Sequence, residues 1–175
     1  CGHAHKALTV IADRAVPYDM QVPRESCYVT LNEIIKSGRI KLDPSRNNFP
    51  VTLHDPCNVV RLMGIVEPQR EILRAIAPQF REMPCNGVHN YCCGGISGRK
   101  KFWQISEAFK DCLGPETKKY ICAPCSNCKG QIRDILEAND LYSKNSFAYG
   151  GLVELIVNCM VDVKPGYIKL EGDEE

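Results

Sequence analysis

Apolar residues recur along the chain at two spacings, one typical of helices and one of buried strands. Apolar positions three and four residues apart predict helices over residues 6–14, 28–37, 67–76, 100–113, 127–140 and 152–162. Short apolar or β-branched runs predict strands over residues 51–55, 119–123 and 146–150. Strands and helices alternate from residue 51 onward, so we predict an α/β fold with three layers, a mainly parallel sheet flanked by helices. In such a sheet the ligand site lies at the carboxyl ends of the strands.

Two segments share the form L-x-E-[IL]-I: LNEII at 31–35 and LVELI at 152–156. The first starts 30 residues after Cys1 and the second 24 residues after Cys128, which indicates an internal repeat in which Cys1 corresponds to Cys128. A chance match between two amphipathic helices is the alternative. We expect residues 1–48 to be the end of a first repeat plus a linker, 49–163 to be the domain that carries the site, and 164–175 to be an acidic tail. Because the chain begins at Cys1, we also expect it to be the C-terminal part of a larger redox subunit.

The net charge and the lack of a long apolar run argue against nucleic acid as a partner and against direct membrane insertion. The 175 residues contain 22 Lys+Arg and 21 Asp+Glu, and a formal net charge of +1 gives no electrostatic reason to bind nucleic acid. No apolar run approaches the ~18–20 residues of a membrane span, so we expect no direct membrane insertion.

The cysteines are the unusual feature of the composition. There are eleven, an odd number, and Cys92, Cys93, Cys122, Cys125 and Cys128 lie within 37 residues of one another. A disulfide framework is typical of chains too short to build a core, which this chain is not. Clustered thiolates favour a soft-metal or iron–sulfur site, and hence a reducing compartment such as the cytoplasm.

Three short motifs carry these cysteines: Cys57, the pair Cys92–Cys93 followed by two glycines, and the pair Cys125-x-x-Cys128. A C-x-x-C lets two sulfurs converge on one centre from a single turn. Adjacent cysteines chelate one ion poorly but can hold neighbouring irons of a larger cluster, and the glycines let the backbone approach inorganic sulfide. Five thiolates exceed the four of a zinc site or an ordinary cubane.

Five motifs give this pattern a family resemblance: HDPC (54–57), the Pro-x-Arg of 68–70, YCCGG (91–95), APCSNC (123–128) and LVELI. Together they resemble the cysteine-rich CCG domain of the heterodisulfide reductase family, which also occurs in glycolate-oxidase iron–sulfur subunits and lactate-utilisation proteins. Within that family CGHAHKA (1–7), SGRKK (97–101), YICAPCSNCKGQI (120–132) and GGLVELIVN (150–158) are most similar to the DsrK-type catalytic subunit of the sulfite-reduction-associated DsrMKJOP membrane complex.

The resemblance implies an oxidoreductase acting on sulfur groups through a noncubane [4Fe–4S] cluster, with Cys57, Cys92, Cys93, Cys125 and Cys128 as cluster ligands. The implied substrate is a disulfide or trisulfide on the small sulfur-carrier protein DsrC. The implied electron donor is menaquinol, through a cytochrome b-type membrane subunit. With that subunit and other complex subunits as partners, the protein would be cytoplasmic and peripheral on the cytoplasmic face of the membrane.

Other residues and other functions remain open at this point. Cys93 is the candidate catalytic cysteine, and His54 and His89 are candidate proton donors to a leaving thiolate, although either histidine can simply bond to backbone in a tight loop. Cys122 is interpreted as a buried thiol, as are Cys27, Cys85, Cys112 and Cys159, with Cys85 close enough to the CCG loop to be a candidate site residue. The alternatives are an iron–sulfur subunit of the glycolate or lactate oxidase type, a ferredoxin-like carrier, and a structural zinc module that uses Cys122, Cys125, Cys128 and one of Cys92 or Cys93.

Overall fold

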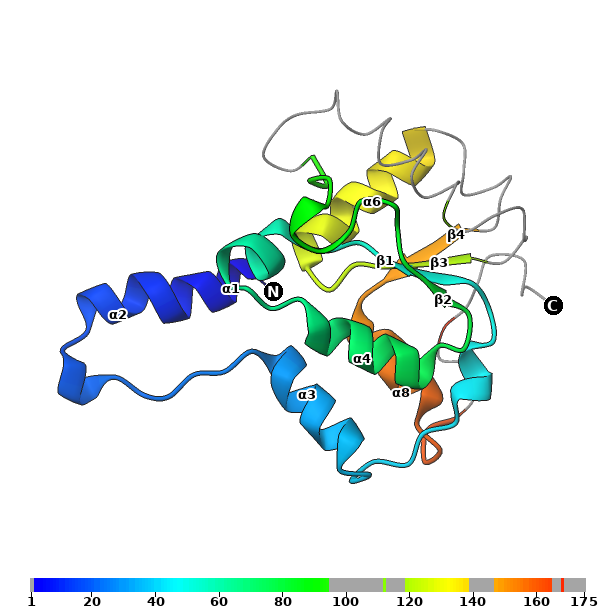
Figure 1. The fold of residues 1–175 in the computed structure, drawn as a ribbon, viewed down its shortest axis with the longest axis horizontal. Coiled ribbons are helices and arrows are strands. Elements are labelled where there is room, and N and C mark those ends of the chain that lie inside the picture. Colours follow the sequence, from blue (N-terminus) through cyan, green and yellow to red (C-terminus); the bar gives the residue numbers. More distant parts are fainter. Residues whose placement is uncertain (1, 95–111, 113–118, 139–146, 165–167, 169–175) are drawn as a thin grey trace.

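The computed structural model describes residues 2–94, 112, 119–138, 147–164 and 168 (Figure 1). The helix predicted over 100–113 and the acidic tail lie almost entirely outside these residues. Within them no helix is long and apolar enough to cross a membrane.

A four-stranded, all-parallel sheet forms the centre of the molecule and confirms the predicted α/β class. Its strands are β1 (Val51–Leu53), β2 (Phe80–Arg81), β3 (Lys119–Cys122) and β4 (Phe147–Gly150), in the order β2-β1-β3-β4. The sequence analysis missed β2 because two residues are too few to show an alternating pattern.

The strand order places a topological switch point between β1 and β3. From β1 the chain crosses to β2 on one side, and it later returns to form β3 on the other side. The loops that leave the carboxyl ends of β1 and β3 therefore diverge and open a crevice at that edge, which is where α/β proteins bind their ligands.

Helices α4 (Glu67–Ile76) and α8 (Leu152–Cys159) cover one face of the sheet, and α3 (Cys27–Lys36) packs against α4 on the outside (Figure 1). Proline opens α4 as predicted, and the apolar stripe of this helix faces the sheet. The first core cluster lies between these layers and includes Val51, Leu53, Ile72, Leu73, Ile76, Tyr120, Cys122, Leu155 and Ile156.

Helix α6 (Ser126–Ala138) covers the opposite face (Figure 1). Successive side chains of a strand point to opposite faces, so Ile121 lies in the α6 layer while its neighbours Tyr120 and Cys122 lie in the α4/α8 layer. The second core cluster contains Met83, Cys93, Ile121, Ala123, Cys125, Cys128, Ile132, Ile135 and Leu136.

The predicted helix at 6–14 is part of a longer helical stretch. It consists of α1 (Gly2–Lys6), the π-helical turn η1 (Ala7–Ile11) and α2 (Ala12–Ala15). Figure 1 shows that this stretch extends away from the sheet, after which the chain passes through the 3₁₀ turn η2 (Tyr18–Met20) and returns to α3.

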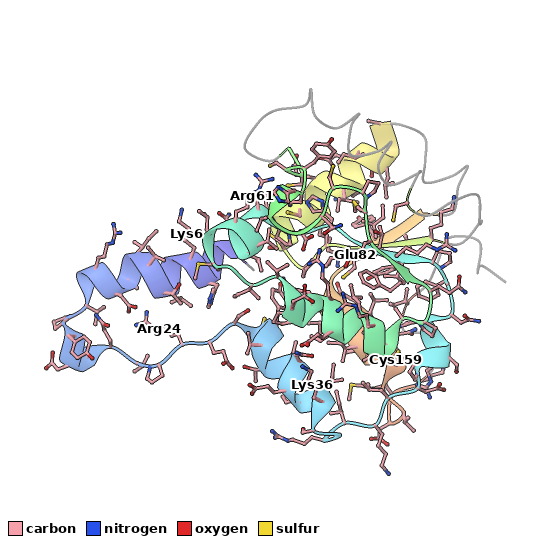
Figure 2. The ribbon with its side chains drawn as sticks, viewed as in Figure 1. Lys6, Arg24, Lys36, Arg61, Glu82 and Cys159 are labelled. Atoms are coloured by element: carbon pink, nitrogen blue, oxygen red, sulfur yellow. The ribbon has the colours of Figure 1, made fainter. Side chains whose placement is uncertain are left out.

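The polar stretch before β1 is bonded to the end of α8. It contains the 3₁₀ turn η3 (Pro44–Asn47), whose Asn47 is fully buried. Asn47 Nδ2 donates to the carbonyl oxygens of Ile76 (3.0 Å) and Leu155 (3.1 Å) and to Cys159 Sγ (2.9 Å), the side chain labelled at the end of α8 in Figure 2. These bonds join α4 and α8 at the edge far from the switch point. The division of the chain at residue 48 stays a prediction.

Candidate metal centre

Three loops carry the candidate ligands, and all three leave the carboxyl edge of the sheet. The loop after β1 ends at Cys57, where the π-helical turn η4 (Asn58–Leu62) begins. The loop after β2 passes through the 3₁₀ turn η5 (Gly87–His89) to Cys92 and Cys93. The loop after β3 carries Cys125 and leads into α6, whose first turn holds Cys128. The parallel topology thus brings together residues that are up to 71 positions apart in the chain (57 to 128).

The five thiols lie next to one another. Cys57 interacts with Cys92 and Cys93, and hydrogen bonds link the Cys128 thiol to those of Cys125 and Cys93. Cys93, Cys125 and Cys128 are buried, whereas Cys57 and Cys92 are half-buried. The group therefore has a buried side against α6 and a more accessible side at Cys57 and Cys92.

Burial and the neighbouring thiols raise the pKa values of Cys57 and Cys128. Burial, followed by the charges of Cys92 and Cys93, raises the pKa of the Cys57 thiol. The pKa of Cys128 is raised first by its hydrogen bonds with Cys125 and Cys93, and then by burial. Several thiolates can coexist in this space only when a positive centre offsets their mutual repulsion, and bound metal provides one.

His54 belongs to the same group of side chains. It is 3% exposed, its backbone N–H donates to the Cys122 carbonyl at 2.8 Å, and its ring nitrogen lies within 4.8 Å of the sulfurs of Cys93 and Cys128. His89 ends η5 and is exposed. Of the two candidate histidines, His54 is the one that lies beside the thiols.

Gly94 has a conformational role in the CCG motif. Its φ is +94°, a region that L side chains rarely adopt, and its N–H donates to Cys92 Sγ at 3.4 Å. The left-handed backbone directs this N–H back toward the Cys92 sulfur. Gly95 lies outside the described residues.

Cys122 lies on the other face of the sheet from Cys125 and Cys128. It is fully buried in the first core cluster, and burial, more than the nearby carboxylates of Glu154 and Asp55, raises the pKa of its thiol. A zinc module that uses Cys122 together with Cys125 and Cys128 does not fit this arrangement. The geometry favours the interpretation of Cys122 as a buried structural thiol.

The other cysteines differ in their surroundings. Cys159 is buried, Cys112 is half-buried with its Sγ 3.2 Å from Thr52 Oγ1, and Cys85 is half-buried, in hydrogen-bond contact with the Tyr91 side chain just before the CCG motif. The prediction that Cys27 is buried was wrong, because Cys27 is the first residue of α3 and is exposed. Cys1 lies outside the described residues.

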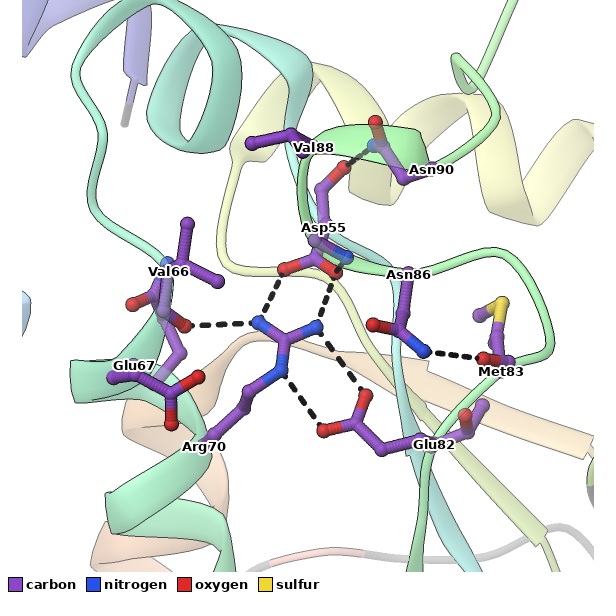
Figure 3. Close-up of polar contacts among 12 residues, drawn as sticks. Asp55, Val66, Glu67, Arg70, Glu82, Met83, Asn86, Val88 and Asn90 are labelled. Atoms are coloured by element: carbon purple, nitrogen blue, oxygen red, sulfur yellow. Dashed lines mark hydrogen bonds and ion pairs between the residues drawn. The ribbon is translucent and has the colours of Figure 1, made fainter.

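Two supporting contacts were missed by the sequence analysis. The hydroxyl of buried Tyr28 donates to the carbonyl of Pro124, the residue before Cys125, and burial raises the pKa of this tyrosine. Asp55, two residues before Cys57, and Arg70, both within the family motifs, form a buried ion pair (Figure 3). A buried tyrosine needs a hydrogen-bond partner and a buried arginine needs a counter-ion, but the sequence does not reveal which partner each has.

The donor set fits an iron–sulfur centre. Thiols are the ligands that such clusters require, and five of them converge here from three loops. The imidazole of His54 adds a nitrogen donor at the buried side. The site therefore has more soft ligands than the four of one tetrahedral ion.

Comparison with known proteins supports the same assignment. Residues 51–133 match the family described as CCG, cysteine-rich domain. The chain is 29% identical over 170 residues to the Hdr-like menaquinol oxidoreductase iron–sulfur subunit 2 of Archaeoglobus fulgidus, an alignment that covers 85% of this chain and 29% of the relative. It is 32% identical over 146 residues to the Hdr-like menaquinol oxidoreductase iron–sulfur subunit of Archaeoglobus profundus, covering 73% of this chain and 25% of the relative.

A third relative belongs to the dihydromethanophenazine:CoB–CoM heterodisulfide reductase of Methanosarcina acetivorans. It is 36% identical over 123 residues, which cover 65% of this chain and 30% of the relative. The chain thus spans less than a third of the length of these relatives. No solved structure matches it significantly. Residues 51–133 are therefore a cysteine-rich CCG domain, and the chain is homologous to the iron–sulfur subunits of Hdr-like menaquinol oxidoreductases and to a heterodisulfide reductase.

Proposed function

We propose that this protein is the iron–sulfur redox subunit of an oxidoreductase that reduces a disulfide or trisulfide. In this proposal a noncubane [4Fe–4S] cluster is held by Cys57, Cys92, Cys93, Cys125 and Cys128. The observation that carries the proposal is the convergence of these five thiols at the switch point of the sheet. When bound, the cluster supplies single electrons to a sulfur substrate, chemistry that free thiols do not provide.

The residues around the thiols then have distinct roles. The α6 face, with Ile132 and Ile135 fully buried, excludes water from the inner side of the site. Substrate approaches on the outer side, where Cys57 and Cys92 are half-buried. His54 lies beside Cys93 and Cys128 and is the side chain that can hold a proton for a leaving thiolate, whereas His89 stays a weaker candidate because it is exposed.

For partners and pathway we propose the DsrK-type assignment. The relatives named menaquinol oxidoreductase subunits support a menaquinol-linked complex, with electrons arriving through a cytochrome b-type membrane subunit at the cytoplasmic face. The relative named heterodisulfide reductase supports a sulfur–sulfur bond as the substrate. The sequences of residues 120–132 and 150–158 favour the carrier protein DsrC as the substrate that contains this bond. A subunit of the glycolate or lactate oxidase type is the alternative.

The substitution Cys93→Ala tests the cluster, with Cys122→Ala as the matched control, because both cysteines are buried but lie on opposite faces of the sheet. We expect the anaerobically prepared protein to be brown, with about four irons and a low-temperature EPR signal on oxidation. Cys93→Ala should lose the signal and the reduction of DsrC trisulfide by a chemical electron donor, whereas Cys122→Ala should keep both.

Three results would count against the proposal. A colourless protein with one zinc would identify an interaction module. A signal that survives Cys93→Ala would remove this cysteine from the ligand set. A cluster that is present but inactive on DsrC trisulfide, in the presence of its electron donor, would remove the DsrK-type assignment and leave the iron–sulfur assignment intact.

A further inference from the structure

Asp55, two residues before Cys57, belongs to an ion network in which every N–H of the Arg70 guanidinium makes a contact (Figure 3). Arg70 of α4 binds Asp55 in a bidentate manner, with Nη1 2.9 Å from Oδ1 and Nη2 2.5 Å from Oδ2. Its Nε and Nη2 lie 2.8 and 3.2 Å from the two carboxylate oxygens of Glu82, and Nη1 also donates to the Val66 carbonyl at 2.8 Å. Five N–H groups thus make five contacts, and the plane of the guanidinium has one orientation.

Asp55 extends this network to the loop that carries the CCG motif. Its Oδ2 also accepts the backbone N–H of Gly87 at 2.5 Å, and its carbonyl oxygen accepts the side-chain amide of Asn90. Asp55 stands two residues before Cys57, and Asn90 stands two residues before Cys92. One aspartate therefore fixes the approach to both half-buried cysteines.

Arg61 contacts the same turn from its outer side. It belongs to η4, which begins directly after Cys57, and its guanidinium donates to the carbonyls of Val88 (3.0 Å) and Asn90. The turn at 87–90 is thus bonded to Asp55, which precedes Cys57 in the chain, and to Arg61, which follows it. The two loops are therefore bonded to each other on both sides of Cys57.

The burial of this network indicates a role other than stability. The side chains of Asp55 and Arg70 are 0% and 3% exposed, and two charges in such a place are costly to desolvate. Well-packed apolar residues of similar volume often give equal or greater stability. Apolar contacts are non-directional, however, whereas a planar bidentate pair sets distance and angle.

We infer that Arg70 and Asp55 are positioning residues that hold the Cys57 loop and the CCG loop in the fixed relative placement that a shared cluster requires. This inference rests on the proposed function only for the identity of the group that the thiols bind. The placement of the two loops is a property of the polypeptide and can be measured without iron.

The test compares Arg70→Lys with Arg74→Lys on the same helix. Lysine keeps the positive charge but lacks the planar guanidinium that binds a carboxylate through two parallel hydrogen bonds. Arg74 pairs with Glu67 on the exposed side of α4, with both side chains more than half exposed, so its replacement is the matched control. Amide hydrogen exchange of the cluster-free protein, followed by mass spectrometry, reports on the loops. Iron content and the EPR spectrum of the reconstituted protein report on the site.

For Arg70→Lys we expect exchange in peptides covering 54–60 and 86–93 to rise about tenfold or more, as for the loss of charged hydrogen bonds, with α8 unchanged. The EPR spectrum should shift or broaden. Arg74→Lys should leave both readouts as in the wild type. Arg61→Lys alters an exposed side chain and should raise amide exchange in the 86–93 peptide alone. This variant provides the test if Arg70→Lys does not fold.

Two results would overturn the inference: exchange in the two loops that equals the wild type, or a rise spread evenly over the sheet and helices, which is what mere loss of stability produces. A protein that binds no iron would end the proposed function, but the exchange comparison would still decide whether Arg70 couples the loops.

Discussion

The hydroxyl of Tyr28 joins the N-terminal part of the chain to the loop that carries Cys125. Tyr28 lies before the residues that match the CCG family, yet its hydroxyl donates to the carbonyl of Pro124 beside Cys125. Its ring belongs to the first core cluster. α3 therefore supports the C-x-x-C loop through this hydrogen bond.

Replacing Tyr28 by Phe removes this hydrogen bond and leaves a carbonyl without that donor. We expect the free energy of unfolding in urea to fall by about 1 kcal/mol, the usual net contribution of one hydrogen bond, with an unchanged denaturant slope. Tyr18→Phe is the control, because Tyr18 is 89% exposed and should change stability very little. Equal losses in the two variants would show that the Tyr28 hydroxyl contributes nothing through Pro124.

At the scale of elements, α6 and α8 lie on opposite faces of the sheet but are joined at the edge that carries the site. Lys129, directly after Cys128, forms an ion pair with Glu154 in the first turn of α8. Burial raises the pKa of Glu154, but hydrogen bonds from Lys129 and from the backbone at Glu154 and Gly151 outweigh this effect and lower the pKa overall. The glutamate of the LVELI motif thus has a structural partner.

This lowered pKa predicts a pH-dependent contribution to stability. A carboxylate whose pKa is lowered in the folded state stabilises the protein when the pH is above the pKa of the unfolded state, about 4.5. This contribution disappears as the pH falls through the lower pKa of the folded state. Glu154→Gln should therefore cost roughly 0.3–1 kcal/mol near pH 7, because both side chains are about a third exposed. The cost should vanish in acid.

Unfolding in urea at pH 7, 5 and 3.5 gives the measurement, with the same substitution in a Lys129→Met background as the control. In that background the difference at neutral pH should shrink, because one of the two causes of the shift is gone. A cost for Glu154→Gln that is independent of pH would contradict the assignment.

At the scale of the whole molecule, the sheet separates a core that holds α4 and α8 from a core that includes the buried thiols. Leu155 of α8 is fully buried in the first core. Cys93, Cys125 and Cys128 belong to the second core. The molecule thus has one face that mainly supplies stability and one face that carries the chemistry.

Leu155→Ala should accordingly lower the free energy of unfolding by about 2–5 kcal/mol, the range for removing a buried leucine side chain. The EPR spectrum of the folded variant should equal that of the wild type. Val153→Ala on the same helix is the control, since Val153 is 49% exposed and its truncation should cost within about 0.5 kcal/mol. A changed spectrum in folded Leu155→Ala would show that the two faces are not independent.

Local patterns in the sequence were sufficient for the class of fold and for the chemistry of the site. Helical spacing predicted α3, α4, α6 and α8, and the alternation with short apolar runs predicted a parallel sheet. The spacing of apolar residues reflects which side of a helix or strand is buried, so it can be recognised in each segment separately. The number and spacing of the cysteines likewise indicated a soft-metal centre, because ligand type depends on residue identity alone.

Long-range packing decided which side chains meet. The two-residue strand β2, the buried position of His54, the face occupied by Cys122, and the contacts of Tyr28 and Arg70 all depend on partners far away in the chain. These contacts depend on the strand order and on the course of the loops. Side chains that are far apart in the chain become neighbours only when the sheet has formed. Residue identity and spacing thus set what the site is made of, and the order β2-β1-β3-β4 set where it lies and what holds it.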